Sequence, residues 1–144
     1  LSWITILKKR ENFREAFNNF HPECIAGYGD KEISSLMQNK GIIRNRNKIE
    51  CAIKSARAFL TMRDAGDSFD SFIWSFTNGE SIQNRWQKME DIPTETLESV
   101  AMSKALKSKG FSYCGPTICY AFMQAIGMVN DHLITCFRYK QLKS

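Results

Sequence analysis

Apolar residues recur every three or four positions along most of the chain, the spacing that gathers them on one face of an α-helix. The pattern predicts a first helix over 2–20, with Ser2 as its N-cap residue. It predicts a second, short helix that is capped by Asp30 and broken at 39–41, where a glycine offers the positive φ that ends helices.

The middle of the chain continues in the same way. A longer helix is predicted to begin after Asn45, as its cap, and to end at Gly66, and a short apolar stripe covers 69–76. Strand-like alternation and internal repeats are missing from the sequence. The fold class is therefore predicted to be all-α.

The last third has the clearest helix boundaries. Thr94 is predicted to cap a helix that ends before Gly110, and Pro116 has the preferred place in the first turn of a second helix, which ends near Gly127. The charges suit the helix dipole, with acids near the first turn and bases near the last, namely Glu95, Glu98, Lys104, Lys107 and Lys109. A helix-hairpin-helix is expected over about 94–128.

Length and composition indicate one globular domain. The chain has 144 residues, 43% of them hydrophobic, and five scattered cysteines, which fit a reducing compartment such as the cytoplasm better than a disulfide framework. The uncharged stretch 111–130 has the length of a membrane span, but its glycines, proline and polar residues favour a buried helix. We expect no membrane association. Because the first residue is Leu1, we also expect that a segment precedes it.

The net charge of +5 is unevenly spread. Residues 40–63 carry seven bases and one acid, whereas residues 64–99 carry eight acids and two bases. This division indicates a side that faces a polyanion, although ordinary solvated helix faces explain it as well. Arg44 lies in the basic block, at a second helix-turn-helix junction, where it is either a DNA contact or a solvated side chain of a structural turn.

The connection 110–117 is the first chemically suggestive segment. Free amide groups at a helix N-terminus bind phosphate, and a glycine lets the backbone approach it closely. We therefore predict DNA-binding residues here, although many helical hairpins carry Gly and Pro for geometric reasons alone. The predicted set is Gly110, Tyr113, Gly115, Thr117 and Lys107.

Two pairs of metal-ligand types occur in the chain. His132 and Cys136 are four residues apart, a spacing that would place both on one face of a helix, and imidazole with thiolate is a zinc-type pair. His21 and Cys24 are a second close pair that would complete a set of four. The alternative is a packed histidine beside a buried thiol.

Several blocks of the chain together resemble bacterial DNA-3-methyladenine glycosylase I over essentially its whole length. They are the segments 1–13, 41–44, 72–76, 103–107 and 110–132, with the last the most specific and 78–92 the weakest. The resemblance implies a helical bundle like that of helix-hairpin-helix DNA glycosylases. It also implies an enzyme that flips 3-methyladenine out of double-stranded alkylated DNA and hydrolyses its N-glycosidic bond.

The resemblance also implies roles for single residues. Trp3 matches the tryptophan of the base pocket, and Leu1 and Ser2 match the segment that fills the gap left by the flipped base. His132 and Cys136 match two of the four ligands of a structural zinc ion, which displaces His21 and Cys24 from that set.

This sequence departs from the family pattern at its start. The family's catalytic-pocket glutamate, two zinc ligands and several pocket aromatics precede the segment that matches Leu1, so we expect a single domain over 1–144 that lacks its N-terminal segment and a known catalytic residue. Asp131 lies near the place of a catalytic aspartate in related glycosylases, but a supporting role beside His132 is the favoured interpretation. A monomer is expected. The alternatives are a non-catalytic DNA-binding module and a metal-stabilised interaction domain.

Overall fold

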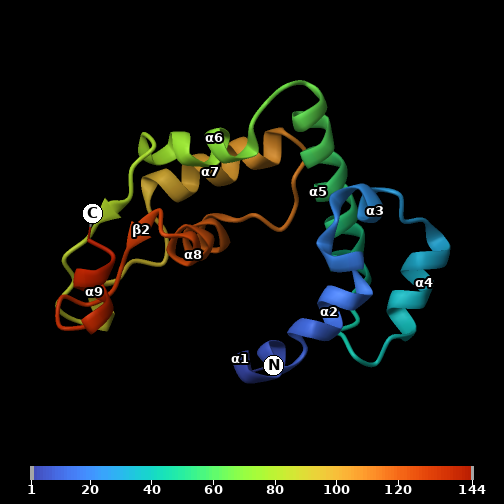
Figure 1. Ribbon diagram of the computed structural model, residues 1–144, viewed down its shortest axis with the longest axis horizontal. Helices are drawn as coiled ribbons and strands as arrows, with labels where there is room; N and C mark the ends of the chain where they lie inside the picture. Colours follow the sequence, from blue (N-terminus) through green and yellow to red (C-terminus); the bar gives the residue numbers. More distant parts are fainter. Residues whose placement is uncertain (1, 144) are drawn as a thin grey trace. The chain divides into compact units, whose positions relative to one another are not determined.

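The computed structural model describes residues 2–143 and confirms the all-α class (Figure 1). The exception is one pair of two-residue strands, β1 (Ile82–Gln83) and β2 (Val129–Asn130), which run parallel with Ile82 opposite Val129. The chain forms two compact units, each with its own buried residues. The prediction of one domain over the whole chain stays a prediction.

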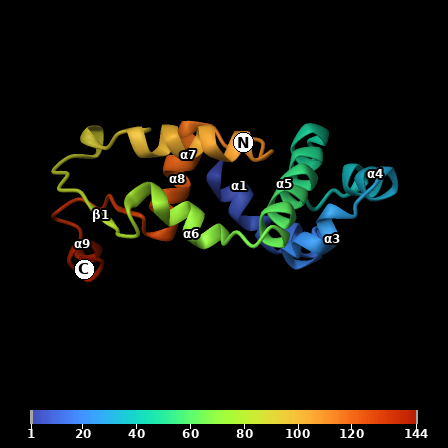
Figure 2. The same cartoon turned by 90° about the horizontal axis from the view of Figure 1, so that it is seen from above.

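The first unit comprises the chain up to Gly66 together with Gly110–Ser112. Helices α3 and α5 lie side by side in it (Figures 1 and 2). Its helices are α1 (Trp3–Lys8), α2 (Arg10–Ala16), the 3-10 helix η1 (Asn18–Phe20), α3 (Pro22–Ala26), α4 (Asp30–Gln38) and α5 (Arg46–Asp64).

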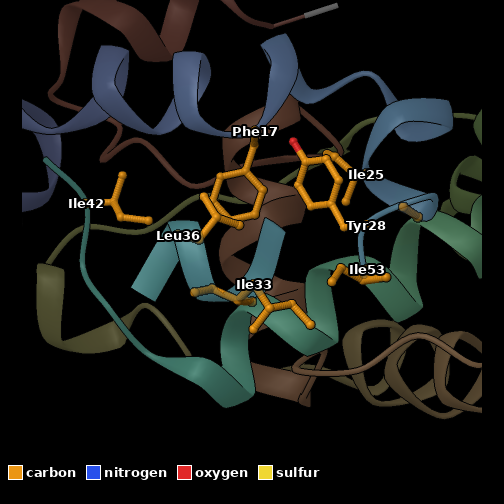
Figure 3. Packing of buried hydrophobic residues seen from close by; sticks show 9 residues of the cluster. Phe17, Ile25, Tyr28, Ile33, Leu36, Ile42 and Ile53 are labelled. Carbon is orange, nitrogen blue, oxygen red and sulfur yellow. The ribbon is translucent and has the colours of Figure 1, made fainter. Parts of the chain in front are cut away.

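The core of the first unit is a cluster of aromatic and branched side chains. Phe17 and Tyr28 face each other with ring centroids 6.4 Å apart, and Ile33, Leu36 and Ile53 approach them from α4 and α5 (Figure 3). The apolar stripes of these short helices are thus buried against one another, and this burial is the main source of their stability.

The predicted first helix is interrupted twice. Ser2 caps α1 as predicted, by accepting a hydrogen bond from the Thr5 amide, but α1 ends at Lys8 and α2 ends at Ala16. The chain then turns left-handed over three residues, with φ of 51°, 54° and 57°. Two of the three are asparagines, which tolerate this conformation better than most residues do, and Asn18 also accepts a hydrogen bond from the Tyr28 hydroxyl.

Two predicted details around α4 were wrong. The N-cap is Gly29, whose amide bonds the Glu32 carboxylate, and Asp30 is the first helical residue. The helix also ends without a positive φ at Gly41. The Gly41 amide instead donates to the Asn39 side chain at 2.8 Å, and a Cβ at Gly41 would lie 3.0 Å from that oxygen, so crowding explains the glycine.

The second unit comprises residues 67–109 and the chain from Tyr113 onward. Helices α7 and α8 pack together in it, and Met102, Met123 and Met128 are fully buried. Its elements besides the strands are α6 (Phe69–Trp74), η2 (Ser75–Thr77), η3 (Met89–Asp91), α7 (Leu97–Ser108), α8 (Pro116–Ile126) and α9 (Phe137–Gln141).

Helix α7 begins two residues later than predicted. Thr96, not Thr94, is its cap: the Thr96 hydroxyl accepts from the Ser99 amide, and the Ser99 hydroxyl accepts from the Thr96 amide. The uncharged stretch 111–130 contains a loop, the eleven-residue α8 and a strand. In the part of the chain that the structure describes, no helix is both long and apolar enough to cross a bilayer.

Candidate functional site

The hairpin between α7 and α8 has the boundaries that its glycines and proline indicate. Gly110 follows the cap of α7 with a φ of +95°, and Pro116 is the first residue of α8. The Cys114 carbonyl accepts hydrogen bonds from the Ser103 hydroxyl at 2.6 Å and the Cys119 thiol at 3.4 Å. The end of the hairpin is therefore tied to both helices.

Gly115 leaves the N-terminus of α8 open. It is the N-cap residue with a φ of −66°, which any residue adopts, and a Cβ placed on it meets no atom within 4 Å among the described residues. No side chain among residues 2–143 caps α8, and its first turn contains no acid. The amides of Thr117 and Ile118 thus lack an acceptor within the helix. This is the arrangement that receives a phosphate group.

The predicted cations of the hairpin differ in their surroundings. Lys107 is exposed in the last turn of α7. The Lys109 ammonium lies 3.5 Å from the Asp67 carboxylate and 5.3 Å from the centroid of the Phe72 ring, so it is held within the second unit. Lys107 is therefore the better placed of the two to attract an anion.

Two other predicted residues of the hairpin are exposed to solvent. Tyr113 is half exposed and has a left-handed φ of 54°, which is unusual for a residue with a side chain. Thr117 is exposed in the first turn of α8. Lys107, Tyr113, Gly115 and Thr117 thus lie within one stretch of eleven residues in the second unit, and the side chains of Lys107, Tyr113 and Thr117 are exposed.

Asp131 is held by four hydrogen-bond donors. Its two carboxylate oxygens accept from the side chains of Asn84, Trp86, Tyr120 and Gln124, at 2.5 to 2.9 Å. Burial opposes ionisation of Asp131, but the four hydrogen bonds together outweigh it and hold the pKa below its usual value. Burial, together with the hydrogen bond to the same carboxylate, raises the pKa of Tyr120.

This arrangement favours a structural role for Asp131. A general base needs an oxygen that is free to accept the proton it abstracts, and here both oxygens are already engaged. The donors Asn84 and Trp86 come from an irregular segment more than 40 residues away, and no periodicity of the sequence marks them, so their role could not be predicted from the sequence.

His132 and Cys136 lie in a turn between β2 and α9 and not on a helix, as their spacing had suggested. The turn still brings them together, with the His132 Nδ1 atom 3.6 Å from the Cys136 Sγ atom. Two ligands of a tetrahedral zinc ion, at about 2.0–2.1 Å for nitrogen and about 2.3 Å for sulfur, are about 3.5–3.6 Å apart. The pair therefore fits two corners of such a site.

The described part of the chain supplies no further ligands for this pair. Among residues 2–143, no group of three or more His, Cys, Asp or Glu side chains converges. His21 and Cys24 both lie at α3 in the first unit, whereas His132 and Cys136 belong to the second. A hollow of about 750 Å³ adjoins Asp131, His132 and Cys136, and its other walls are mainly apolar.

The predicted base-pocket residues lie at the start of the first unit. Trp3 is the first residue of α1 and is 83% exposed, so it is not a core aromatic. Ser2 is exposed and its hydroxyl caps α1, while Leu1 lies outside the described residues. Arg44 is exposed in the connection before α5.

Comparisons with known proteins agree with each other. The family model for methyladenine glycosylase matches residues 1–139. A DNA-3-methyladenine glycosylase of Haemophilus influenzae is 51% identical over 136 residues, which cover 94% of this chain and 74% of the relative. DNA-3-methyladenine glycosylase 1 of Escherichia coli is 48% identical over 139 residues, 96% of this chain and 74% of the relative.

Solved structures show the same similarity. A crystal structure of 3-methyladenine DNA glycosylase I superimposes with a TM-score of 0.92 at 50% identity, covering 95% of this chain and 75% of that one. The structure of Staphylococcus aureus 3-methyladenine DNA glycosylase I was solved to explain its recognition of 3-methyladenine. It superimposes with a TM-score of 0.89 at 36% identity, covering 95% of this chain and 73% of that one.

Proposed function

Because the chain belongs to the methyladenine glycosylase family, we propose that it acts in base-excision repair as an N-glycosylase, which hydrolyses the bond between 3-methyladenine and deoxyribose in alkylated DNA. The observation that carries this proposal is the match of the family over residues 1–139, together with the open hairpin it contains. The damaged base must leave the duplex first, because its reacting atoms are buried in the base stack.

The hairpin is proposed to hold the DNA backbone. A phosphate group accepts hydrogen bonds from the open amides at the start of α8, and Gly115 leaves room for it because a side chain would stand in its path. The Thr117 hydroxyl adds a further contact to the phosphate. Lys107 attracts the DNA backbone, and Tyr113 lies against the DNA backbone. Gly110 contributes through its left-handed turn, which positions the loop.

Trp3 is proposed to face the flipped base. 3-Methyladenine carries a positive charge, and the face of an indole ring attracts a cation, so an exposed tryptophan selects the methylated base over neutral adenine. The positive charge also makes the base a good leaving group, and little proton transfer is required. Leu1 and Ser2 are proposed to occupy the gap left in the duplex, and the carboxylate that completes the pocket is expected in a segment before Leu1.

A structural zinc ion is proposed at His132 and Cys136, whose 3.6 Å separation fits two of its ligands. When bound, the ion would cross-link this turn to the segment that supplies the other two ligands. Asp131 holds the turn through its four hydrogen bonds, so the two donors are positioned before any metal arrives. The chain is further proposed to act as a monomer on double-stranded DNA, which light scattering of the complex would test.

The experiment that tests the function compares binding with base release on one substrate. Duplex DNA treated with a methylating agent is incubated with the chain, and with the chain extended at its N-terminus by the proposed upstream segment that carries the pocket carboxylate. Abasic sites are then detected by alkaline cleavage. The proposal predicts abasic sites from the extended chain. If the extended chain binds the DNA and forms none, the chain is a non-catalytic DNA-binding module.

A further inference from the structure

Ser103 is a serine in the interior of α7 whose hydrogen-bond partner lies outside its own helix. The helix contains three serines, and the hydroxyls of Ser99 and Ser108 each donate to the carbonyl three residues earlier, which is a common local pattern. The Ser103 hydroxyl instead donates to the Cys114 carbonyl, eleven residues later in the chain, at 2.6 Å. The local chemistry of the helix therefore does not explain this serine.

Packing alone does not explain Ser103 either. The residue is 2% exposed, and its neighbours Met102 and Leu106 on the same helix are also buried. An apolar side chain could occupy such a position without the cost of removing a hydroxyl from water. The Ser103 hydroxyl serves the carbonyl that it contacts, so the orientation of that carbonyl is the feature to explain.

The Cys119 thiol holds the same carbonyl from α8. It is buried, and its sulfur atom lies 3.4 Å from the Cys114 oxygen. Burial raises the pKa of Cys119 to about 11, so the thiol keeps its proton at neutral pH and is able to donate it. Two buried donors, one from each helix of the hairpin, thus fix the direction of the Cys114 carbonyl.

The direction of this carbonyl determines the direction of the Gly115 amide. The two groups belong to one peptide bond, which is planar and trans, so the C=O and N–H bonds point in opposite directions. Because the Cys114 oxygen points toward two buried side chains, the Gly115 N–H points away from them. Among residues 2–143, no acceptor receives a hydrogen bond from this amide. It is therefore available to a ligand.

We propose that Ser103 is a positioning residue for DNA binding. Through the Cys114 carbonyl it directs the Gly115 amide outward, and this amide donates to the phosphate group that the hairpin holds. The inference rests on the proposed function, in which the hairpin binds the DNA backbone. An amide that is oriented in advance loses less entropy on binding, and a hydrogen bond to a charged phosphate is stronger than one to a neutral acceptor. Ser103 itself is buried and makes no contact with the DNA.

The test follows the Gly115 amide directly by NMR. The 144-residue chain is labelled with a heavy nitrogen isotope only at its eight glycines, and a short undamaged duplex is added. The Gly115 signal is identified by its loss in Gly115→Ala. Ser103→Ala removes the hydroxyl, and Ser103→Cys keeps the size of the side chain but donates more weakly. Ser108→Ala is the matched control, since it removes a hydroxyl from the same helix and only a local hydrogen bond.

In the wild type, we expect the proton signal of the Gly115 amide to move downfield when DNA is added, because the amide gains a phosphate acceptor. The movement should be lost in Ser103→Ala, intermediate in Ser103→Cys and unchanged in Ser108→Ala. DNA affinity, measured by fluorescence anisotropy, should fall by up to about tenfold in Ser103→Ala, the equivalent of one hydrogen bond to a charged group, and by less than about twofold in Ser108→Ala. The position of the Gly127 signal without DNA reports whether the other end of α8 is intact in each variant.

A Gly115 signal that moves as far in Ser103→Ala as in the wild type would overturn the inference, and so would a signal that does not move in the wild type. If the Gly127 signal shows that Ser103→Ala is unfolded, Ser103→Cys decides, and a full wild-type movement in that variant would count against the inference. Failure of the proposed function is a separate result. It would appear as an extended chain that forms no abasic sites, whatever the movement of the Gly115 signal.

Discussion

Gly110 and Gly115 border the same hairpin but are glycines for different reasons. Gly110 has a left-handed φ of +95°, whereas Gly115 has a φ of −66° and open space where a Cβ would stand. The fold therefore requires the first glycine and not the second. We assign the second glycine to the proposed ligand, a phosphate group that would approach the backbone there.

The first prediction separates these two roles. Gly110→Ala should lower the free energy of unfolding by about 1–2 kcal/mol, because alanine is strained at positive φ even though the nearest side chain, Ala58, lies at an ordinary distance. Gly115→Ala should change the free energy of unfolding by less than about 0.5 kcal/mol. Alanine is a poorer N-cap residue than glycine, which destabilises the folded protein, but it also makes the unfolded chain less flexible, which stabilises it. DNA affinity should nevertheless fall in Gly115→Ala. Chemical denaturation and anisotropy measure both quantities, and unchanged affinity would refute the hairpin assignment.

The second prediction concerns Asp131. Asp131→Asn should lower the free energy of unfolding by about 2–3 kcal/mol, because the new amide group faces donors where a carboxylate oxygen had accepted two hydrogen bonds. Tyr120→Phe, which removes one donor, should cost less, about 1–2 kcal/mol. Urea denaturation of the two variants measures the difference. A stable Asp131→Asn protein that binds DNA but no longer releases base would instead identify Asp131 as catalytic.

The third prediction concerns the metal pair. Cobalt bound in place of zinc gives a thiolate charge-transfer absorption, which Cys136→Ser should abolish in the extended chain. Cys24→Ser is the matched control, since Cys24 is exposed in the other unit, and the absorption should persist in it. Loss of the absorption in Cys24→Ser and its retention in Cys136→Ser would reverse the assignment and return His21 and Cys24 as the ligands.

The fourth prediction concerns thiol reactivity. Burial raises the pKa of Cys119 to about 11, so this side chain is a protonated thiol at pH 8 and also donates to the Cys114 carbonyl. Iodoacetamide at pH 8 should therefore modify the exposed Cys24 well before Cys119, as mass spectrometry of peptides from the folded protein would show. Equal rates for the two cysteines would show that the hairpin opens readily.

The sequence predicted those elements whose boundaries depend on local chemistry. Ser2 and Asn45 cap their helices, Gly66 and Gly127 end theirs in left-handed conformations, and Pro116 opens α8. Each of these residues affects only the backbone conformation or hydrogen bonds of the helical turn to which it belongs or which follows it. They are therefore visible without knowledge of the rest of the fold.

The features that the sequence did not predict depend on distant partners. The break between α1 and α2 occurs beside Lys9, whose ammonium donates to the carbonyls of Lys40 and Gly41. The hydrogen bonds from Asn84 and Trp86 to Asp131 join segments more than 40 residues apart, and the short β1–β2 pairing lies beside them. The His132–Cys136 pair was correctly predicted to be close, but through a turn and not through a helix.

Release of free 3-methyladenine tests the central claim most directly. Duplex DNA methylated with a radioactive methyl donor is incubated with the extended chain, and the soluble bases are separated by chromatography. We predict that 3-methyladenine is released. Trp3→Ala should release it more slowly because the contact with the flipped base is lost, and Gly115→Val because the contact with the DNA backbone is lost. An extended chain that binds the methylated duplex tightly and releases no 3-methyladenine would contradict it.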